Sequence, residues 1–279
     1  MPLMMPARRG QTIGAQSNLA ATPSATNIAV NVAANASANT KTASPVTLIA
    51  STTVESCALI VAFANNSATA AQRNGLVDIM TGAAASEVVI AANLSNTVAT
   101  ALSSTGGNIS FFLPIRIPAG TRISARHQNS TGSTNCQVAV FPVPMGDLPP
   151  FPVFSGCEMI GADTSTSTLT AITAGNSGAE SGWTSIGSAT AQTYQAVMPV
   201  MTTAANTTMT ALAYHMEWGY SSTTMGERYF TTVTNETVGN LMPNGLIDYV
   251  QIPSGTQLQI QAECSGTGES VGYGLLCFY

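Results

Sequence analysis

Two stretches of the sequence decide the fold: "FLPIRIPAGTRISARHQ" at residues 112–128 and "DYVQIPSGTQLQIQAEC" at residues 248–264. In the second stretch, Leu258, Ile260 and Ala262 alternate with three glutamines. Such an alternation predicts a β-strand that is buried on one side. The first stretch has the same pattern more weakly. In both, an Ile-Pro-x-Gly-Thr sequence precedes the strand and predicts a tight turn, because proline presets one backbone angle and glycine suits the last turn position.

These two stretches indicate that the chain is a tandem duplication. The turn sequences begin at Ile117 and Ile252, which are 135 residues apart. Further upstream, residues 44–61 align with residues 181–198 at a spacing of 137, and five of the 18 aligned positions are identical. Several matches in the same order and at nearly constant spacing predict two copies of one domain.

The predicted fold is all-β, with two tandem jelly-roll-like β-sandwich domains from an internal duplication and an extended N-terminal arm. Short strand candidates between turns rich in Gly, Ser, Asn and Thr are typical of sandwiches, and each copy has a length that suits an eight-stranded jelly roll. A stretch of closely spaced prolines indicates a semi-rigid linker. The expected boundaries are 1–40 for the arm, 41–143 for the first sandwich, 144–156 for the linker and 157–279 for the second sandwich.

Composition limits the classes of partner. Hydrophobic residues make up 45% of the chain and charged residues only 8%, where about 25% is typical of soluble domains. The surface must therefore consist largely of uncharged side chains, and such surfaces tend to associate. The net charge of −5 argues against nucleic acid as a ligand, because phosphate binding requires clustered Lys and Arg.

Neither membrane insertion nor secretion is expected. The longest apolar run, Cys57–Ala64, is far shorter than the roughly 20 residues of a membrane span. The N-terminal residues lack the apolar centre of a signal peptide, so we expect assembly in a cytoplasm. The five cysteines are odd in number and include no C-x-x-C pair, which predicts buried thiols rather than a zinc site. A Cys264–Cys277 bridge stays open as an alternative in an exported particle.

Little in the sequence indicates catalysis. It contains none of the common nucleotide-binding or hydrolase motifs. His215 and Glu217 would share one face of a strand next to Trp218, where they form a base with its carboxylate, the wall of a sugar-binding cleft, or only a polar sheet face. No two carboxylates are placed at the separation that glycoside cleavage requires. We therefore expect no enzyme, no catalytic residue, no cofactor and no metal.

Three of the seven arginines lie around the first turn: Arg116, Arg122 and Arg126. Arg122 and Arg126 are four residues apart and so share one face of a strand. In the second copy, glutamines replace both. The arginines keep an edge strand soluble, or they form a subunit contact in which guanidinium groups meet a neighbouring chain. Their loss in the second copy suggests that the two copies face different surroundings.

The second copy also holds both tryptophans of the chain and several tyrosines. Aromatic rings of this kind either fill a sandwich core or form a platform for sugars. The candidate glycan-binding residues are Trp183, Tyr214, Trp218 and Tyr220.

One part of the first copy resembles a known family. "GLVDIMTGAAASEVVIAANL" at residues 75–94, followed by the stretch at 112–128, is similar to a pattern in virion structural proteins of tailed bacteriophages. The similarity covers about 50 residues, and the second copy keeps only the "IPSGT" turn of the pattern. The matching residues are Asp78, Ile79, Gly82, Ala83, Ser86, Glu87, Leu113–Pro118 and Gly120–Arg126.

The resemblance implies a structural virion component, such as a head decoration or a vertex spike. The expected partners are other copies of the chain, in a cyclic trimer or pentamer, and other virion proteins such as the major capsid protein. An alternative is a tail-associated or receptor-binding adhesin that recognises a host-surface polysaccharide through the second domain. The implied location is the virion, and the resemblance brings no catalytic residues.

Overall fold

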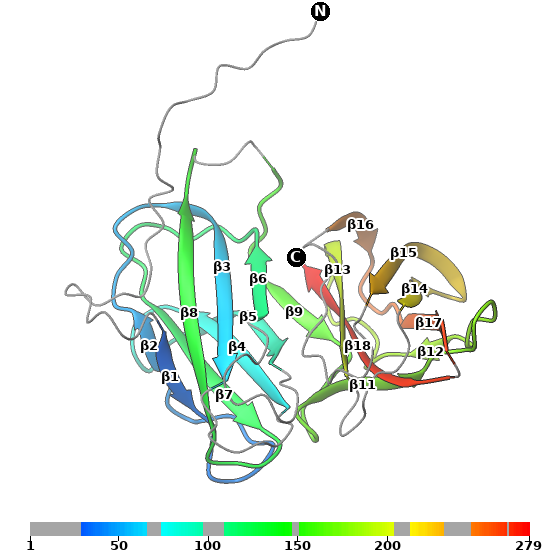
Figure 1. Cartoon of the computed structure of the whole chain (residues 1–279). Coiled ribbons are helices and arrows are strands. Elements are labelled where there is room, and N and C mark those ends of the chain that lie inside the picture. Colours follow the sequence, from blue (N-terminus) through cyan, green and yellow to red (C-terminus); the bar gives the residue numbers. More distant parts are fainter. Residues whose placement is uncertain are drawn as a thin grey trace, which may run out of the picture.

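The computed structural model describes residues 29–65, 74–96, 109–146, 151–203, 213–231, 247–266 and 268–279. These residues form an all-β protein without a helix (Figure 1). Accordingly, the described part of the chain contains no helix long and apolar enough to cross a membrane.

The first half is a sandwich of two antiparallel sheets. One sheet has the strand order β1-β8-β3-β6, and the strands facing it have the order β2-β7-β4-β5. The bounds of the first sheet are β1 Val30–Ala33, β8 Asn135–Pro144, β3 Ser56–Asn65 and β6 Ile109–Leu113. Those of the second are β2 Val46–Ile49, β7 Ile123–Asn129, β4 Gly75–Thr81 and β5 Val88–Ser95.

The second half repeats this strand order. One side has β11-β18-β13-β16 and the other β12-β17-β14-β15, so each strand number is ten higher than its counterpart. This is the arrangement that the predicted duplication would produce. The bounds are β11 Thr168–Thr173, β18 Ser270–Phe278, β13 Tyr194–Thr203 and β16 Asp248–Ile252. The facing strands are β12 Thr184–Ser185, β17 Leu258–Cys264, β14 Ala213–Tyr220 and β15 Thr223–Thr231.

The two Ile-Pro-x-Gly-Thr turns are held in the same way. Gly120 and Gly255 have φ angles of 79° and 80°, in the left-handed region that favours glycine. The hydroxyl of Thr52 donates to the carbonyl of Pro118, and the hydroxyl of Thr190 donates to that of Pro253. Thr52 and Thr190 are therefore the equivalent residues. The sequence alignment had placed Thr53 opposite Thr190, one residue out of step.

A short strand joins the two halves. β9 (Cys157–Ile160) pairs in parallel with β5 and antiparallel with β18, so one sheet of ten strands crosses the molecule. β10 (Ala162–Asp163) follows and pairs with β11. Just before β9, in the segment expected to be a linker, Phe154 forms a bridge with Ile115 and its ring lies 5.2 Å from that of Phe278. The end of this segment is thus packed between the halves.

β1 lies within the range expected to be an extended arm. Val32 is fully buried and β1 pairs with β8, so residues 30–33 belong to the first sandwich. The cause is the alternation Val30-Asn31-Val32, which gives the strand one apolar side. Residues 1–28, the rest of the predicted extended arm, lie outside the described part of the chain.

The sheet between the halves is buried on both sides. On β13, Ala196, Met198 and Val200 lie in the apolar core of the first half, while Val197 and Met201 lie in that of the second. β18 divides its side chains in the same way. Strands that are buried on both faces read as continuous apolar runs, and the sequence around both strands has this character.

The cysteines are buried and no disulfide joins them. All five lie in the described part of the chain, so the alternative of a Cys264–Cys277 bridge is wrong. Burial raises the pKa of the thiols of Cys136, Cys157 and Cys277.

Candidate functional site

The three arginines form ion pairs within the chain. Arg126 lies on β7 and Arg122 directly precedes this strand. Because β7 is flanked by β2 and β4, the interpretation as an edge strand is wrong. Arg126 Nε donates to Asp78 Oδ2 at 2.7 Å, and Arg122 pairs with Glu87. Arg116, which is exposed, pairs with Glu55. The pairs Asp78–Arg126 and Glu87–Arg122 join the two blocks of the pattern that resembles the phage family.

Asp78 is the centre of a buried polar network. Its carboxylate also accepts from Lys41 and from the backbone N–H of Asn93 at 2.8 Å. Lys41, the chain's only lysine, additionally donates to Asn93 Oδ1 at 2.9 Å. Burial lowers the pKa of Lys41, while the adjacent carboxylate opposes that effect. These contacts hold the outer face of the strands β2-β7-β4-β5 together.

Two of the four candidate sugar-binding rings lie in the core. Tyr214 and Trp218 are 1% and 0% exposed, so neither offers a ring to a ligand. Their polar atoms are used internally: Tyr214 donates its hydroxyl to Glu269, and Trp218 Nε1 donates to Asp248 Oδ2 at 3.2 Å. Trp183, beside β12, and Tyr220, at the end of β14, are half-buried.

A cluster of acidic and polar residues lies on the outer side of the sheet β12-β17-β14-β15, and the sequence predicted only part of it. We call this cluster the acidic face. It comprises Glu180, His215, Glu217, Glu227, Gln261 and Glu263. His215 Nδ1 lies 3.4 Å from Glu180, and Nε2 lies 3.3 Å from Glu227. The His215 ring stacks on Tyr229 with centroids 4.5 Å apart. The sequence predicted that His215 and Glu217 share a face, but Glu180 and Glu227 lie far from them along the chain.

Within the described residues, Glu180, His215 and Glu217 form a group that could hold a metal ion, since one ligand atom from each lies within 4.8 Å of the others. Gln261 Nε2 donates to both carboxylates, at 2.5 Å and 2.6 Å. Burial and the neighbouring Glu217 raise the pKa of Glu180. Nitrogen and oxygen ligands of this kind suit divalent transition metals.

The outer face of the sheet β1-β8-β3-β6 is apolar. Ile60 lies opposite Phe141 on one side and Phe112 on the other, and Ala62 and Ala139 extend the row. We call these five residues the apolar face. Phe151 packs on Phe112 with ring centroids 5.7 Å apart. The four strands contain no Asp, Glu, Lys, Arg or His.

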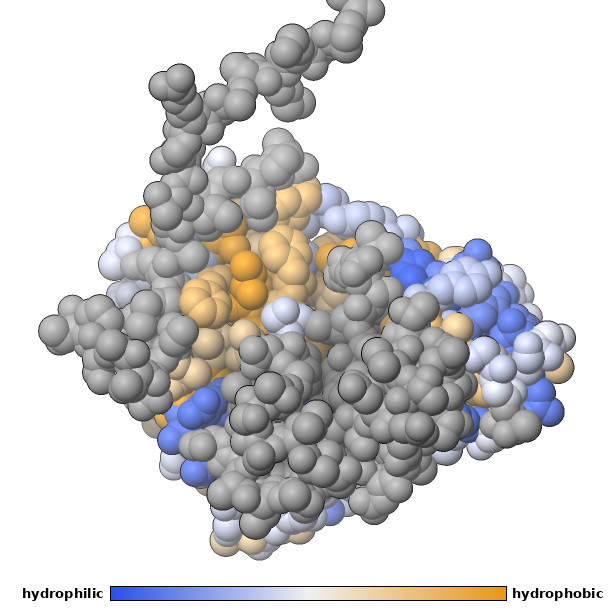
Figure 2. All heavy atoms as spheres, in the orientation of Figure 1, coloured by the Kyte–Doolittle hydropathy of each residue, from blue (hydrophilic) through white to orange (hydrophobic). Residues whose placement is uncertain are grey.

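Figure 2 shows this segregation. Hydrophobic residues gather over the first half, where Figure 1 places β3 and β8, whereas hydrophilic residues gather over the second half. Sequence reasoning noted the apolar run Cys57–Ala64 but not that alternate residues of the run face outward. A strand with one side in the core needs apolar residues only at alternate positions. An apolar run without any charged residue is therefore the signal that could have found this face.

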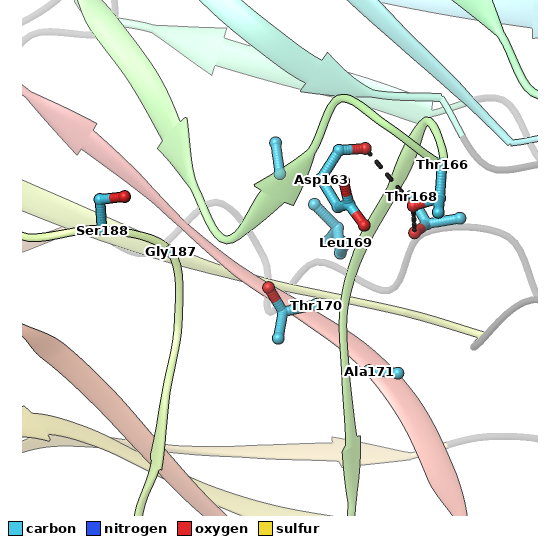
Figure 3. Close-up of a pocket in the computed structure, with 9 residues that line it drawn as sticks. Asp163, Thr166, Thr168, Leu169, Thr170, Ala171, Gly187 and Ser188 are labelled. Carbon is cyan, nitrogen blue, oxygen red and sulfur yellow. Dashed lines mark hydrogen bonds between the residues drawn. The ribbon is translucent and has the colours of Figure 1, made fainter. Parts of the chain in front are cut away.

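Two open grooves lie in the second half. The first, the Asp163 groove, has a volume of about 530 Å³ and lies beside β10 and β11. Figure 3 shows that its polar groups bond to one another: the Thr166 hydroxyl lies 2.7 Å from that of Thr168 and donates to the carbonyl of Asp163. The Asp163 carboxylate accepts from the backbone and hydroxyl of Ser165. Few groups remain there for a ligand.

The second, the Tyr220 groove, has a volume of about 590 Å³. It lies where the hairpin β14–β15 meets the turn before β17. It is lined by Tyr220, Ser221, Ser222, Gly255, Thr256, Gln257 and Gln259.

Comparison with known proteins adds little. No family model and no curated protein matches the chain. Among solved structures, PNGF-II is 10% identical with a TM-score of 0.36, covering 90% of this chain and 65% of that one. The STIV MCP is 11% identical with a TM-score of 0.33, covering 89% and 94%. The CBM22-1–CBM22-2 tandem domain of Paenibacillus barcinonensis Xyn10C is 9% identical with a TM-score of 0.23, covering 81% and 79%. The chain thus spans less than two thirds of the PNGF-II chain, and likenesses at these scores carry no inference about activity.

Proposed function

We propose that the chain is a structural component of a virus-like particle, such as a head decoration or spike protein, and that it assembles as a ring of identical subunits. The apolar face carries this proposal. The resemblance to virion proteins of tailed bacteriophages supports it, and so does a fold whose ionic side chains mostly pair within the chain.

The size and chemistry of the apolar face suit a protein contact. Strands of four, ten, ten and five residues, with a rise of about 3.3 Å per residue and a spacing of about 4.8 Å, give a sheet face of roughly 460 Å², against about 800 Å² per partner in a standard interface. Interface centres are depleted in charge and rich in aromatic residues. The apolar face, with Phe112 and Phe141 beside Ile60 and no charged residue in its four strands, has both properties.

A second copy of the chain is the partner we propose. The residues of the apolar face are half-buried, apart from Ala139, which is buried. Four other apolar residues are between 39% and 56% exposed, and we call them the apolar rim: Val54, Met145, Val153 and Tyr249. A contact between the face of one copy and the rim of the next joins two different surfaces. Heterologous contacts form a ring when the rotation between neighbouring subunits closes, as in a trimer or pentamer.

Light scattering during size-exclusion chromatography tests the assembly. We expect the wild-type chain to elute at a mass of several subunits. Phe112→Glu on the face and Met145→Glu on the rim should each give monomers, because a charge in an apolar contact has no partner there. Val88→Glu is the matched control, since Val88 is 66% exposed but lies on β5, away from both surfaces.

A change in mass can be attributed to a lost contact once thermal melting shows that each variant is folded. A monomeric wild-type chain would contradict the proposal. So would folded face and rim variants that keep the wild-type mass.

Gold-labelled antibodies on purified particles test the location. Label on the head or its vertices is the expected result. Label confined to the tail would instead favour a tail-associated component, and particles without label would exclude a virion role.

A further inference from the structure

The only lysine of the chain lies beside a carboxylate and a carboxamide at once. Lys41 Nζ donates to the carboxylate of Asp78 and, at 2.9 Å, to Oδ1 of Asn93. Apart from His215, the other cations in the described ion pairs are all arginines. An arginine neutralises a carboxylate at least as well as a lysine does, but only the lysine amine can become a nucleophile. The position of Lys41 therefore suits a reaction as well as an ion pair.

The strand pairing brings the carboxylate and the carboxamide to the same face of the sheet. Asp78 lies on β4 between the core residues Val77 and Ile79, so its side chain points away from the core. The register between β4 and β5 shifts at Asp78, and Asn93 on β5 has a φ angle of 57° there. A bulge of this kind re-aims a side chain. The backbone N–H of Asn93 donates to Asp78 at 2.8 Å, which fixes the position of the bulge.

The amine of Lys41 and the amide carbon of Asn93 are close enough to react. An Nζ–Oδ1 distance of 2.9 Å places Nζ within about 4.1 Å of Cγ, because a C=O bond is about 1.23 Å long. Reacting atoms in near-attack geometry are about 3–3.5 Å apart, so a small rotation of the lysine side chain suffices. Water has little access, since the side chains of Lys41 and Asp78 are 16% and 4% exposed. Burial lowers the pKa of Lys41 against the opposing effect of Asp78, which favours the neutral amine.

We propose that Lys41 and Asn93 form an intramolecular isopeptide bond, with Asp78 as the proton acceptor. The ammonium group of Lys41 gives a proton to the Asp78 carboxylate, and the electron pair freed on Nζ attacks Cγ of Asn93. The Nζ–Cγ bond forms and the Cγ–Nδ2 bond breaks. A second proton passes from Nζ to Nδ2, so ammonia leaves and takes the proton of Asp78 with it as ammonium. The step needs no oxidant, reductant or co-reactant, and the structure shows the three groups before the reaction.

The bond ties the segment between β1 and β2 to β5. It closes a loop of residues 41–93, which contains β2, β3 and β4. A cross-link stabilises a protein mainly by restricting its unfolded chain, and more so for a long loop. The inference concerns the first half alone and does not depend on the proposed assembly.

Intact-mass spectrometry of the purified full chain, both fresh and after overnight incubation, tests the proposal. We expect the wild type to be lighter than its sequence by about 17 Da, the mass of one ammonia. Lys41→Arg keeps a cation beside Asp78 but supplies no amine. Asn93→Gly suits the positive φ angle and removes the amide. Both variants should have the full mass of their sequences.

Trypsin digestion locates the bond. Trypsin does not cleave after an acylated lysine, so the linked chain should give peptide 10–73 joined to peptide 74–116. An unlinked chain gives peptides 10–41, 42–73 and 74–116 separately. A wild-type chain of full mass would overturn the proposal. So would the same mass deficit in Lys41→Arg, because cyclisation of an Asn-Gly pair such as Asn74-Gly75 also releases ammonia.

Asp78→Asn tests the proton acceptor, because it keeps the size of the side chain and removes its basicity. A time course of the mass change should show bond formation slowed at least about a hundredfold. A folded Asp78→Asn chain that links at the wild-type rate would refute the role of Asp78. If this variant does not fold, Lys41→Arg and Asn93→Gly still decide whether the bond forms.

Discussion

At the scale of single residues, several charged groups in the described part of the chain stabilise the fold through ion pairs. Asp78 shows this, because it is 3% exposed and still contacts both Lys41 and Arg126. A buried carboxylate is tolerated only when it is paired and hydrogen-bonded. The same residues carry the resemblance to phage virion proteins. We therefore expect that this pattern marks a structural unit and not a binding motif.

His127 is the residue with the clearest consequence for stability. It lies on β7 and is 1% exposed, and burial together with the positive charge of Lys41 lowers its pKa to about 4. The unfolded chain takes up this proton near pH 6.5, whereas the folded chain does so only near pH 4. Stability from neutral His127 is therefore present above pH 6.5 and is lost as the pH falls towards 4.

Replacing His127 should remove that dependence. We expect the free energy of unfolding of the wild type to fall, relative to His127→Gln, by up to about 3 kcal/mol between pH 7 and pH 4. Urea unfolding at several pH values measures this difference. Parallel curves for the two proteins would show that His127 does not titrate as described.

At the scale of elements, the hairpin β14–β15 is the least typical part of the described chain. Its register shifts between Trp218 and Gly219, and its turn uses two serines with positive φ. A β-bulge increases the local twist and changes the direction of nearby side chains. The hairpin thus leaves the regular sheet at the point where it borders the Tyr220 groove.

Relieving the strain in this turn should stabilise the protein. Changing Ser221→Asn together with Ser222→Gly supplies residues that favour positive φ, so we expect the free energy of unfolding to rise by about 1 kcal/mol. Thermal unfolding measures the gain. Ser254→Gly serves as the control, because Ser254 lies in an exposed turn without positive φ and should give no gain. A double variant no more stable than the control would show that the turn is unstrained.

The sequence predicted the elements well wherever side chains alternate. The strand at 258–264 was read directly from its pattern, and its three apolar residues are buried as expected. Prediction was poorer where both faces of a strand are covered, as on β13, because a continuous apolar run does not reveal which core each residue enters. The acidic face could be predicted only for His215 and Glu217. The register of the β14–β15 hairpin brings Glu227 to them, and the segment before β12 brings Glu180, and neither arrangement can be read from alternation within one strand.

At the scale of the whole molecule, the two halves form one body. β9 joins their sheets into one, and polar contacts link the halves as well: Gln128 Nε2 donates to the carbonyl of Thr164 and the hydroxyl of Ser167, each at 2.9 Å. The sequence predicted two sandwiches with a linker between them. Repetition and proline content suggested that arrangement, but neither indicates whether two domains share a sheet.

A sheet shared by both halves predicts a single unfolding transition. Leu59 in the first half and Leu258 in the second are both fully buried, and Leu→Ala in a core costs about 2–5 kcal/mol. We expect Leu59→Ala and Leu258→Ala each to shift one common transition to lower temperature in scanning calorimetry, with equal calorimetric and van't Hoff enthalpies. Two transitions, each responding to only one substitution, would indicate independent domains.

The position of β18 has a mechanical consequence. This strand is the last of the chain, yet it lies inside a sheet and pairs with β11 and β9 on one side and β13 on the other. A force that pulls β18 along its own axis must shear all three pairings at once, because hydrogen bonds across the strand share the load instead of opening one after another. We therefore expect this strand to resist tension well.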